Sequence, residues 1–304
     1  MDIEELIRDT ITICAVASPT GHEEERATEM LERLSAVPGL TVGLDRHGNV
    51  VARVPGSAPA GPPVVVAAHL DTVFGHEIKL RPGRAGERLL GPGIGDNSLA
   101  LAVLLQLARA LTAAPPSGDV ILAATVGEEG LGNLKGIRGL LQDQSAAAVV
   151  ALEGHGIYDL VIGAVGSVRL EVACETPGGH SWRDRGAVSA VHEVARTVTG
   201  LAYGLPPSVP GCAVNVGTIA GGTGINVIAA RAVLQVDLRA VDAGVLDQAE
   251  AVGRAIVDAT LNQEHVSYAV REIGRRPAGS LPPEHPIVAA AQAARAAAGL
   301  PPAH

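Results

Sequence analysis

The chain has 304 residues, a formal net charge of −9 at pH 7 and only 2% aromatic residues. This length is enough for two domains with sizeable cores, and the acidic balance argues against nucleic acid as a partner, because phosphate binding needs a basic surface. Three widely spaced cysteines argue against a disulfide framework and indicate reduced thiols, as in a cytoplasm. The start, MDIEELIRDTI, lacks the basic and apolar regions of a signal peptide.

The first half of the chain alternates helical and strand-like patterns. We expect, in chain order, helices at 3–17 and 22–35, a hairpin around His47-Gly48-Asn49, a strand in PPVVVAAHLDTV, a helix at 98–113, a strand in GDVILAATVGEEG, a helix near 133–142 and a strand in AAAVVALEG. Strands alternating with helices predict a mainly parallel sheet covered on both faces. The apolar helix SLALAVLLQLARAL is too short to span a bilayer, so we expect no membrane contact.

From about residue 163 the strands begin to alternate apolar and polar residues. The order strand, helix, strand, strand, helix, strand predicts a ferredoxin-like unit whose sheet has one exposed face. A last helix follows in EHPIVAAAQAARAAAGL. We therefore expect a first domain over 1–162, an inserted ferredoxin-like domain over 163–274, and a return to the first domain over 275–304.

Acidic residues and a histidine stand where the apolar runs of the first half end. In chain order they are His69, Asp71, Asp96, Glu128, Glu129 and Glu153. Taken singly, each has a structural explanation, such as a solvated strand end, a helix N-cap or an acidic first helical turn. Together, at the carboxyl edge of one sheet, these carboxylates would repel one another unless cations were present. Oxygen ligands with a single histidine favour a hydrolytic zinc site over a structural one.

Spacing suggests how two of these groups would cooperate. His69 and Asp71 are two residues apart, so on a strand they face the same side. A carboxylate there can accept the free imidazole N–H and fix the tautomer of a metal-binding histidine. The adjacent Glu128 and Glu129 point in different directions, so one can bind metal while the other accepts a proton.

The motifs HLDT, GPGIGDN, GEEG and ALEG, followed by a ferredoxin-like insertion, resemble one family of di-zinc hydrolases. It includes aminoacylase, carboxypeptidase G, peptidase T and the acetylornithine and succinyl-diaminopimelate deacylases. The resemblance covers nearly the whole chain. It implies an α/β, mainly parallel, zinc-exopeptidase-like (phosphorylase/hydrolase-like) catalytic domain with an inserted ferredoxin-like α+β lid, which usually also forms a homodimer.

The resemblance also implies roles for the acidic residues. His69, Asp96 and Glu153 would bind the first zinc, and Asp96 would bridge to a second zinc held by Glu129. Asp71 would orient His69, and Glu128 would be the general base. The bridging aspartate of the family often precedes a cis peptide bond. Two zinc ions per chain are implied, with cobalt or manganese as possible substitutes.

Three lid residues match the family as well. His180, in PGGHSW, would help to stabilise the oxyanion, and Asn226, in GTGINVIAA, would touch substrate, although Ala229 stands where the family has proline. Arg239, in QVDLRA, would pair with a substrate carboxylate. A surface charge on a strand explains Arg239 equally well.

The chain departs from the family at two places. Asn97-Ser98 follow Asp96, where the family commonly has Asp-Lys. The second zinc of the family also needs a histidine well after the helix that here spans 285–299, and a substrate-binding loop lies before it. Here the sequence stops at His304, which would be a ligand only if the tail folded back.

Two functions remain open on the sequence. The first is a zinc-dependent hydrolase that cleaves an amide bond in a small peptide or N-acyl amino acid, through a metal-bound water with Glu128 as base. Aminopeptidase, carboxypeptidase and deacylase activities are all compatible with it. The second is a truncated, non-catalytic family member that acts as a dimerising or ligand-binding module.

Overall fold

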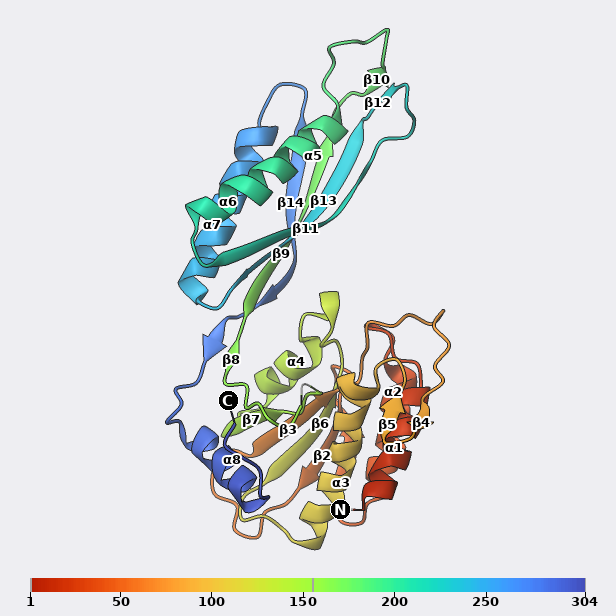
Figure 1. Ribbon diagram of the computed structural model, residues 1–304, viewed down its shortest axis with the longest axis vertical. Helices are drawn as coiled ribbons and strands as arrows, with labels where there is room; N and C mark the ends of the chain where they lie inside the picture. Colours follow the sequence, from red (N-terminus) through yellow and green to blue (C-terminus); the bar gives the residue numbers. More distant parts are fainter. Residues whose placement is uncertain (1, 155, 304) are drawn as a thin grey trace. The chain divides into compact units, whose positions relative to one another are not determined.

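The computed structural model describes residues 2–154 and 156–303 (Figure 1). The chain divides into two compact units, which are described separately. Unit 1 comprises Met1–Leu160 and Ala291–His304, and unit 2 comprises Val161–Ala290. The domain boundaries expected at 162/163 and 274/275 stay predictions. His304, considered as a metal ligand, and His155 lie outside the described residues.

A five-stranded sheet forms the centre of unit 1, in the order β1-β2-β6-β3-β7. Its strands are β1 (Thr41–Leu44), β2 (Val50–Val54), β3 (Val64–His69), β6 (Val120–Thr125) and β7 (Ala148–Ala151). β3 pairs in parallel with β6 and β7, whereas β2 pairs antiparallel with β1 and β6. The predicted α/β fold with parallel strands is confirmed, and the predicted hairpin provides the antiparallel edge.

Helices cover both faces of this sheet (Figure 1). They are α1 (Ile3–Ala15), α2 (Glu24–Ser35), α3 (Leu99–Ala113) and α4 (Lys135–Asp143). Alternate residues of β3 face opposite sides of the sheet. Val66 and Ala68 pack in the larger core with α1, α2 and α3, whereas Val65 and Ala67 pack with Leu140 of α4.

The apolar helix α3 is part of this core. With the irregular turn before it, Ile94–Ala113 is long and apolar enough by composition to cross a bilayer, although the sequence pattern predicted a shorter segment. Half of the segment is buried inside unit 1. Leu101, Leu104 and Leu105 are fully buried in the larger core, so α3 has the environment of a core helix.

One short hairpin of unit 1 has no counterpart in the sequence prediction. It consists of β4 (Gly83–Ala85) and β5 (Arg88–Leu90), which pair antiparallel. Strands of three residues are too short for an alternating pattern to be recognised.

Unit 2 contains a four-stranded antiparallel sheet in the order β11-β13-β9-β14. Its strands are β9 (Gly166–Glu175), β11 (Cys212–Gly221), β13 (Arg231–Ala240) and β14 (Ser267–Arg276). The helices α5 (Ala190–Thr199) and α7 (Ala243–Leu261) pack on the sheet, with the short α6 (Leu205–Ser208) beside them. This topology confirms the predicted ferredoxin-like unit.

Two small strand pairs accompany the main sheet of unit 2. β10 (Gly179–His180) pairs with β12 (Val227–Ile228), and β8 (Gly163–Ala164) pairs with β15 (Gly279–Ser280). The last helix, α8, spans Pro286–Ala297.

Candidate metal centre

Most of the residues predicted to form a site in unit 1 follow three neighbouring parallel strands, whereas Asp96 lies in the irregular turn Ile94–Ser98 before α3 and not at the end of a sheet strand. β3, β6 and β7 pair in parallel register, so their carboxyl ends lie at one edge of the sheet. His69 is the last residue of β3. The loops after these strands carry, in chain order, Asp71, Glu128, Glu129 and Glu153.

His69 is the centre of the cluster. Its side chain is 3% exposed, and its Nε2 lies 2.9 Å from Asp96 Oδ1 and 3.8 Å from Glu153 Oε2. One ligand atom from each of the three residues lies within 4.8 Å of the others. Ligand atoms that share one zinc ion, at about 2.0–2.2 Å from it, have separations of this order.

A second group of possible ligands overlaps the first. His69, Glu128 and Glu129 also offer ligand atoms within 4.8 Å of one another. In the described ranges 2–154 and 156–303, these two groups are the candidate metal clusters, and both contain His69. Five of the six predicted residues therefore meet in one place, and the sixth, Asp71, contacts His69.

Asp71 contacts His69 in a way that the sequence did not show. The nearest acceptor to His69 Nδ1 is the main-chain oxygen of Asp71 at 2.9 Å, and the Asp71 carboxylate is further away, with Oδ1 at 3.5 Å. A hydrogen on Nδ1 would leave Nε2 free for a metal ion. The structure thus brings Asp71 to the predicted partner, mainly through its main chain.

The carboxylate of Asp71 has other partners, although it is fully buried. It accepts the main-chain N–H groups of Glu128 at 2.9 Å and Glu129 at 2.8 Å, and the hydroxyl of Thr20 at 2.9 Å. Burial acts to raise the pKa of Asp71, but the hydrogen bonds from His69 and from these two amides outweigh it and lower the pKa. Asp71 is therefore a buried anion that fixes the loop of the two glutamates.

The loops that carry Asp96 and Glu153 are in direct contact. A Cβ on Gly154 would lie 2.1 Å from the main-chain oxygen of Gly95, so only glycine fits there. The fully buried Asn97 donates its Nδ2 to the carbonyl of Leu152 at 2.9 Å. The Asp96–Asn97 peptide bond is cis, as the resemblance implied. These contacts hold both carboxylates near His69.

The electrostatics of the cluster favour a cation. Burial acts to lower the pKa of His69, but the hydrogen bond to Asp71 and the charges of Glu153 and Asp71 outweigh it and raise the pKa to about 9. Burial and the charge of Asp96 raise the pKa of Glu129. A divalent cation would neutralise this excess of negative charge. One imidazole among carboxylates is a donor set that fits hydrolytic zinc.

Comparisons with known proteins agree with this chemistry. The model described as Peptidase family M28 matches residues 49–162, and the model described as Peptidase dimerisation domain matches residues 162–265. A probable carboxypeptidase of Aspergillus clavatus is 30% identical over 277 residues, which is 82% of this chain and 60% of that protein. A probable carboxypeptidase of Ajellomyces dermatitidis is 25% identical over 287 residues, 84% of this chain and 66% of its own length. The chain thus spans less than two thirds of these relatives.

Solved structures share the fold. A tripeptidase from Staphylococcus aureus has a TM-score of 0.81 at 20% identity, over 99% of this chain and 83% of that one. A dinuclear metal-binding peptidase of family M20 from Bacillus subtilis has a TM-score of 0.69 at 15% identity, over 99% and 81%. The chain belongs to the M20/M28 metallopeptidase family. The resemblance inferred from HLDT, GPGIGDN, GEEG and ALEG is thereby confirmed.

Two of the residues predicted to contact substrate are neighbours in unit 2. His180 lies in β10, next to β12, and the carbonyl of Asn226 accepts the N–H of Ser181 at 3.0 Å. The imidazole Nδ1 of His180 accepts the N–H of Trp182 at 3.2 Å. The structure therefore places His180 and Asn226 side by side, and their roles stay predictions.

Arg239 lies elsewhere in unit 2. It is eight residues along β13 from Arg231, a separation of about 26 Å at the usual rise of a strand. β12 precedes the Arg231 end of that strand. Arg239 Nε pairs with Asp237 Oδ2 at 2.8 Å, and the Arg239 side chain is half exposed. Its predicted role as a carboxylate ligand stays a prediction, and its present partner is an acidic neighbour on the same strand.

Two further residues, which the sequence analysis did not select, support the site. Glu23 is buried, and its Oε1 accepts the N–H groups of Gly21 at 2.8 Å and Gly127 at 3.1 Å. Arg26 is fully buried and donates to the carbonyl of Leu70 at 2.8 Å. Every residue from His22 to Arg26 is polar or charged, so no pattern in the sequence distinguishes the buried Glu23 and Arg26 from their exposed neighbours.

Proposed function

We propose that this metallopeptidase is a zinc-dependent hydrolase that cleaves an amide bond in a small peptide or an N-acyl amino acid. The observation that carries the proposal is the position of His69, whose buried imidazole meets Asp96 and Glu153 in one candidate ligand group and Glu128 and Glu129 in another. The names of the carboxypeptidase relatives support an exopeptidase.

The first group supplies the ligands of the first zinc, which would be His69, Asp96 and Glu153. The ligands of the second zinc would be Asp96 and Glu129, as the family resemblance implies; Glu129 is a member of the second group. When bound, the two ions would polarise the scissile carbonyl and make water a stronger acid. Cobalt or manganese would be possible substitutes.

The chain's own side chains would supply the proton transfers. Glu128 would accept a proton from water and deliver it to the leaving amine, as a general base and then a general acid. Asp71 would keep Glu128 in place, because its carboxylate accepts the main-chain N–H of Glu128 at 2.9 Å. In unit 2, His180 would stabilise the oxyanion, Asn226 would contact substrate and Arg239 would pair with a substrate carboxylate.

We further propose a homodimer in a cytoplasmic setting. The match of residues 162–265 to a peptidase dimerisation domain supports the dimer. Three free cysteines, Cys14, Cys174 and Cys212, support a reducing compartment.

Zinc content and hydrolysis, measured on the same preparation, test the proposal. The panel would hold di- and tripeptides, peptides with blocked amino or carboxyl ends, and N-acyl amino acids, each with added Zn²⁺, Co²⁺ or Mn²⁺. We expect close to two zinc ions per chain and cleavage of at least one substrate class. Less than one zinc per chain and no hydrolysis with any metal would favour the alternative of a non-catalytic module, which the peptidase relatives support less well.

A further inference from the structure

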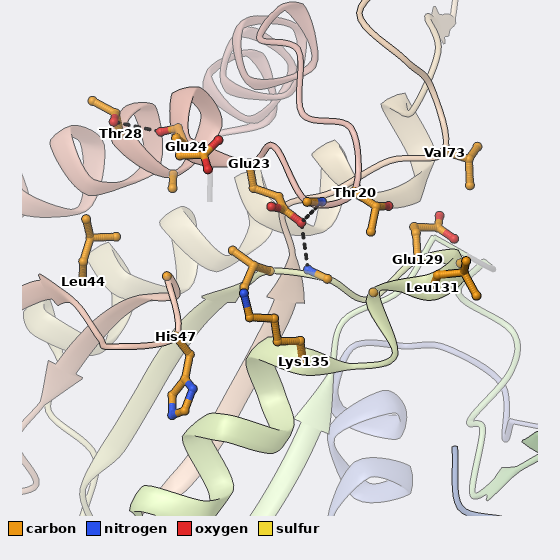
Figure 2. Close-up of a pocket in the computed structure, with 17 residues that line it drawn as sticks. Thr20, Glu23, Glu24, Thr28, Leu44, His47, Val73, Glu129, Leu131 and Lys135 are labelled. Atoms are coloured by element: carbon orange, nitrogen blue, oxygen red, sulfur yellow. Dashed lines mark hydrogen bonds between the residues drawn. The ribbon is translucent and has the colours of Figure 1, made fainter. Parts of the chain in front are cut away.

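A cavity of about 580 Å³ lies in unit 1 (Figure 2). Its walls are the first turns of α2, the turn between β1 and β2, and the loop that leads from β6 to α4. Apolar side chains, including Val73, Val126 and Leu131, form much of the lining. Sites for small molecules usually measure roughly 300–1,000 Å³ and combine an apolar lining with a few polar groups. This cavity has the size and character of such a site.

The cavity borders the candidate metal centre. Glu129 is a possible metal ligand and also lines the cavity. Thr20 lines it as well, and its hydroxyl donates to Asp71 Oδ2 at 2.9 Å. A substrate whose amide bond lay at the cluster would therefore extend into the cavity.

The carboxylates around the cavity differ in their availability. Glu23 is 7% exposed, and its Oε1 is occupied by the main-chain N–H groups of Gly21 and Gly127. Glu129 belongs to the cluster, where a cation would neutralise it. Glu24 is exposed in the first turn of α2, where the helix dipole stabilises a negative charge. Each of these charges thus has a partner or a favourable field.

Among the described residues that line the cavity, Lys135 is the charged residue that lacks such a partner. Its side chain reaches from the start of α4 into the cavity (Figure 2). Within the part of the chain that the structure describes, its ammonium group makes no hydrogen bond and no ion pair. The sequence contains one other lysine, Lys79, which does not line the cavity.

The backbone of Lys135 is fixed relative to the loop of Glu129. Its N–H donates to the carbonyl of Gly127 at 3.2 Å. The fully buried Asn49 accepts the N–H of Val126 at 3.0 Å and donates to the carbonyl of Gly136 at 2.9 Å. The side chain of Asn49 therefore joins the turn between β1 and β2 to the glutamate loop and to the start of α4. The main chain from which the Lys135 side chain extends is thereby held in place.

We propose that this cavity is a subsite for a carboxylate group of the substrate and that Lys135 is the residue that binds it. The inference rests on the proposed hydrolase function and specifies its substrate class. An ammonium group without a partner, held in a largely apolar cavity beside the centre, forms a charge-assisted hydrogen bond with a carboxylate. The carboxylate is either the free carboxyl terminus of a peptide or the side chain of an acidic residue.

Matched pairs of substrates that differ by one carboxylate test this inference with the metal-loaded chain. Ala-Ala and its carboxyl-terminal amide report on the terminal group, and the pairs Ala-Glu with Ala-Gln and Glu-Ala with Gln-Ala report on the side chain. For one pair we expect that Lys135→Met lowers the kcat/KM ratio of acid to amide by roughly tenfold or more, because a hydrogen bond between charged groups is lost. Lys135→Arg should retain most of the ratio, since it keeps the charge.

Lys79→Met is the matched control, and it should leave every ratio as in the wild type. The inference is overturned if Lys135→Met leaves all three ratios unchanged, or if Lys79→Met changes them equally. If the wild type cleaves none of these substrates, the proposed hydrolase function fails for them, and calorimetric binding of the same dipeptides then decides the subsite. If Lys135→Met binds the acid more weakly than the wild type does but binds the amide equally well, the subsite is supported. If the two proteins bind the acid equally, or neither binds it, the subsite is rejected.

Discussion

The carboxylate of Asp71 accepts the main-chain N–H of Glu128 at 2.9 Å. The residue whose main-chain oxygen faces the His69 imidazole therefore also sets the position of the proposed base. One buried anion thus connects His69, a candidate ligand on β3, with the loop after β6 that carries Glu128. A change at Asp71 should therefore affect both metal binding and the position of the base.

Asp71→Asn should weaken metal binding while leaving the chain folded. An amide keeps the shape of the carboxylate, but it turns a donor toward one of the groups that now donate to Asp71, which are the amides of Glu128 and Glu129 and the hydroxyl of Thr20. We expect zinc affinity to fall by about 10–100-fold, as for other changes behind a metal ligand. Competition with a chromophoric chelator measures the affinity. Asp143→Asn, which alters a surface pair with His47, is the control. Equal zinc affinity in Asp71→Asn and wild type would contradict the connecting role of Asp71.

Glu128→Gln should abolish turnover and keep the metal. The amide cannot accept the proton from water, and loss of general acid–base catalysis costs about 10²–10⁴-fold in rate. The first ligand group, His69 with Asp96 and Glu153, does not include Glu128 and stays intact. Steady-state kinetics and zinc analysis on one sample provide both readouts. Glu25→Gln, an exposed change on α2, serves as the control. Activity close to that of wild type in Glu128→Gln would remove this residue as the base.

Gly154→Ala should disturb the first ligand group. The new Cβ would lie 2.1 Å from the Gly95 oxygen, so the loops of Asp96 and Glu153 must separate. We expect a loss of about 1–3 kcal/mol in the free energy of unfolding, as for other overpacked sites, together with weaker zinc binding. Gly118→Ala, where a Cβ meets nothing within 4 Å, is the control. Thermal unfolding without metal and zinc titration separate the two effects. If the unfolding free energy and the zinc affinity of Gly154→Ala both equal those of the wild type, the close contact between the two loops is not needed for stability or for metal binding.

Zinc should stabilise the folded chain. The first ligand group joins residues 69, 96 and 153, which are distant in sequence, so the unfolded chain does not preserve the site. At a free zinc concentration of about 100 times Kd, the expected stabilisation is about 2.7 kcal/mol. Thermal unfolding with graded Zn²⁺ and with a chelator measures it. His69→Ala should lose the response, because both candidate groups contain His69. A response of the same size in His69→Ala would place the stabilising ion elsewhere.

The sequence was most informative about groups at the ends of strands. His69 and Glu153 follow from strand order, because the carboxyl ends of parallel strands share one edge. The hydrogen bonds of the Asp71 carboxylate could not be predicted in this way. Their donors are the main-chain N–H groups of Glu128 and Glu129, which lie 57 and 58 positions away in a loop without a regular pattern. Asn49 was read only as part of a turn, although its side chain spans 77 and 87 positions to Val126 and Gly136.

The positions of the substrate-side residues were harder to predict for a different reason. His180, Asn226 and Arg239 were selected by their match to family motifs, which carries no information on distances within a sheet. The structure sets Asn226 beside the segment of His180, whereas Arg239 lies near the opposite end of β13. Strand register, which decides this, is set by pairing between segments that a single motif does not contain.

Asn49 also has a consequence for how the specificity of such a hydrolase can change over time. Its buried amide secures the backbone of the glutamate loop and of the first turn of α4, whereas the side chain of Lys135 projects from that backbone without contributing to it. Substitutions at position 135 can therefore alter which substrates are selected while the proton-transfer machinery stays in place. Substitutions at position 49 would disturb substrate selection and proton transfer at once. Position 135 is therefore free to diverge, whereas position 49 is not.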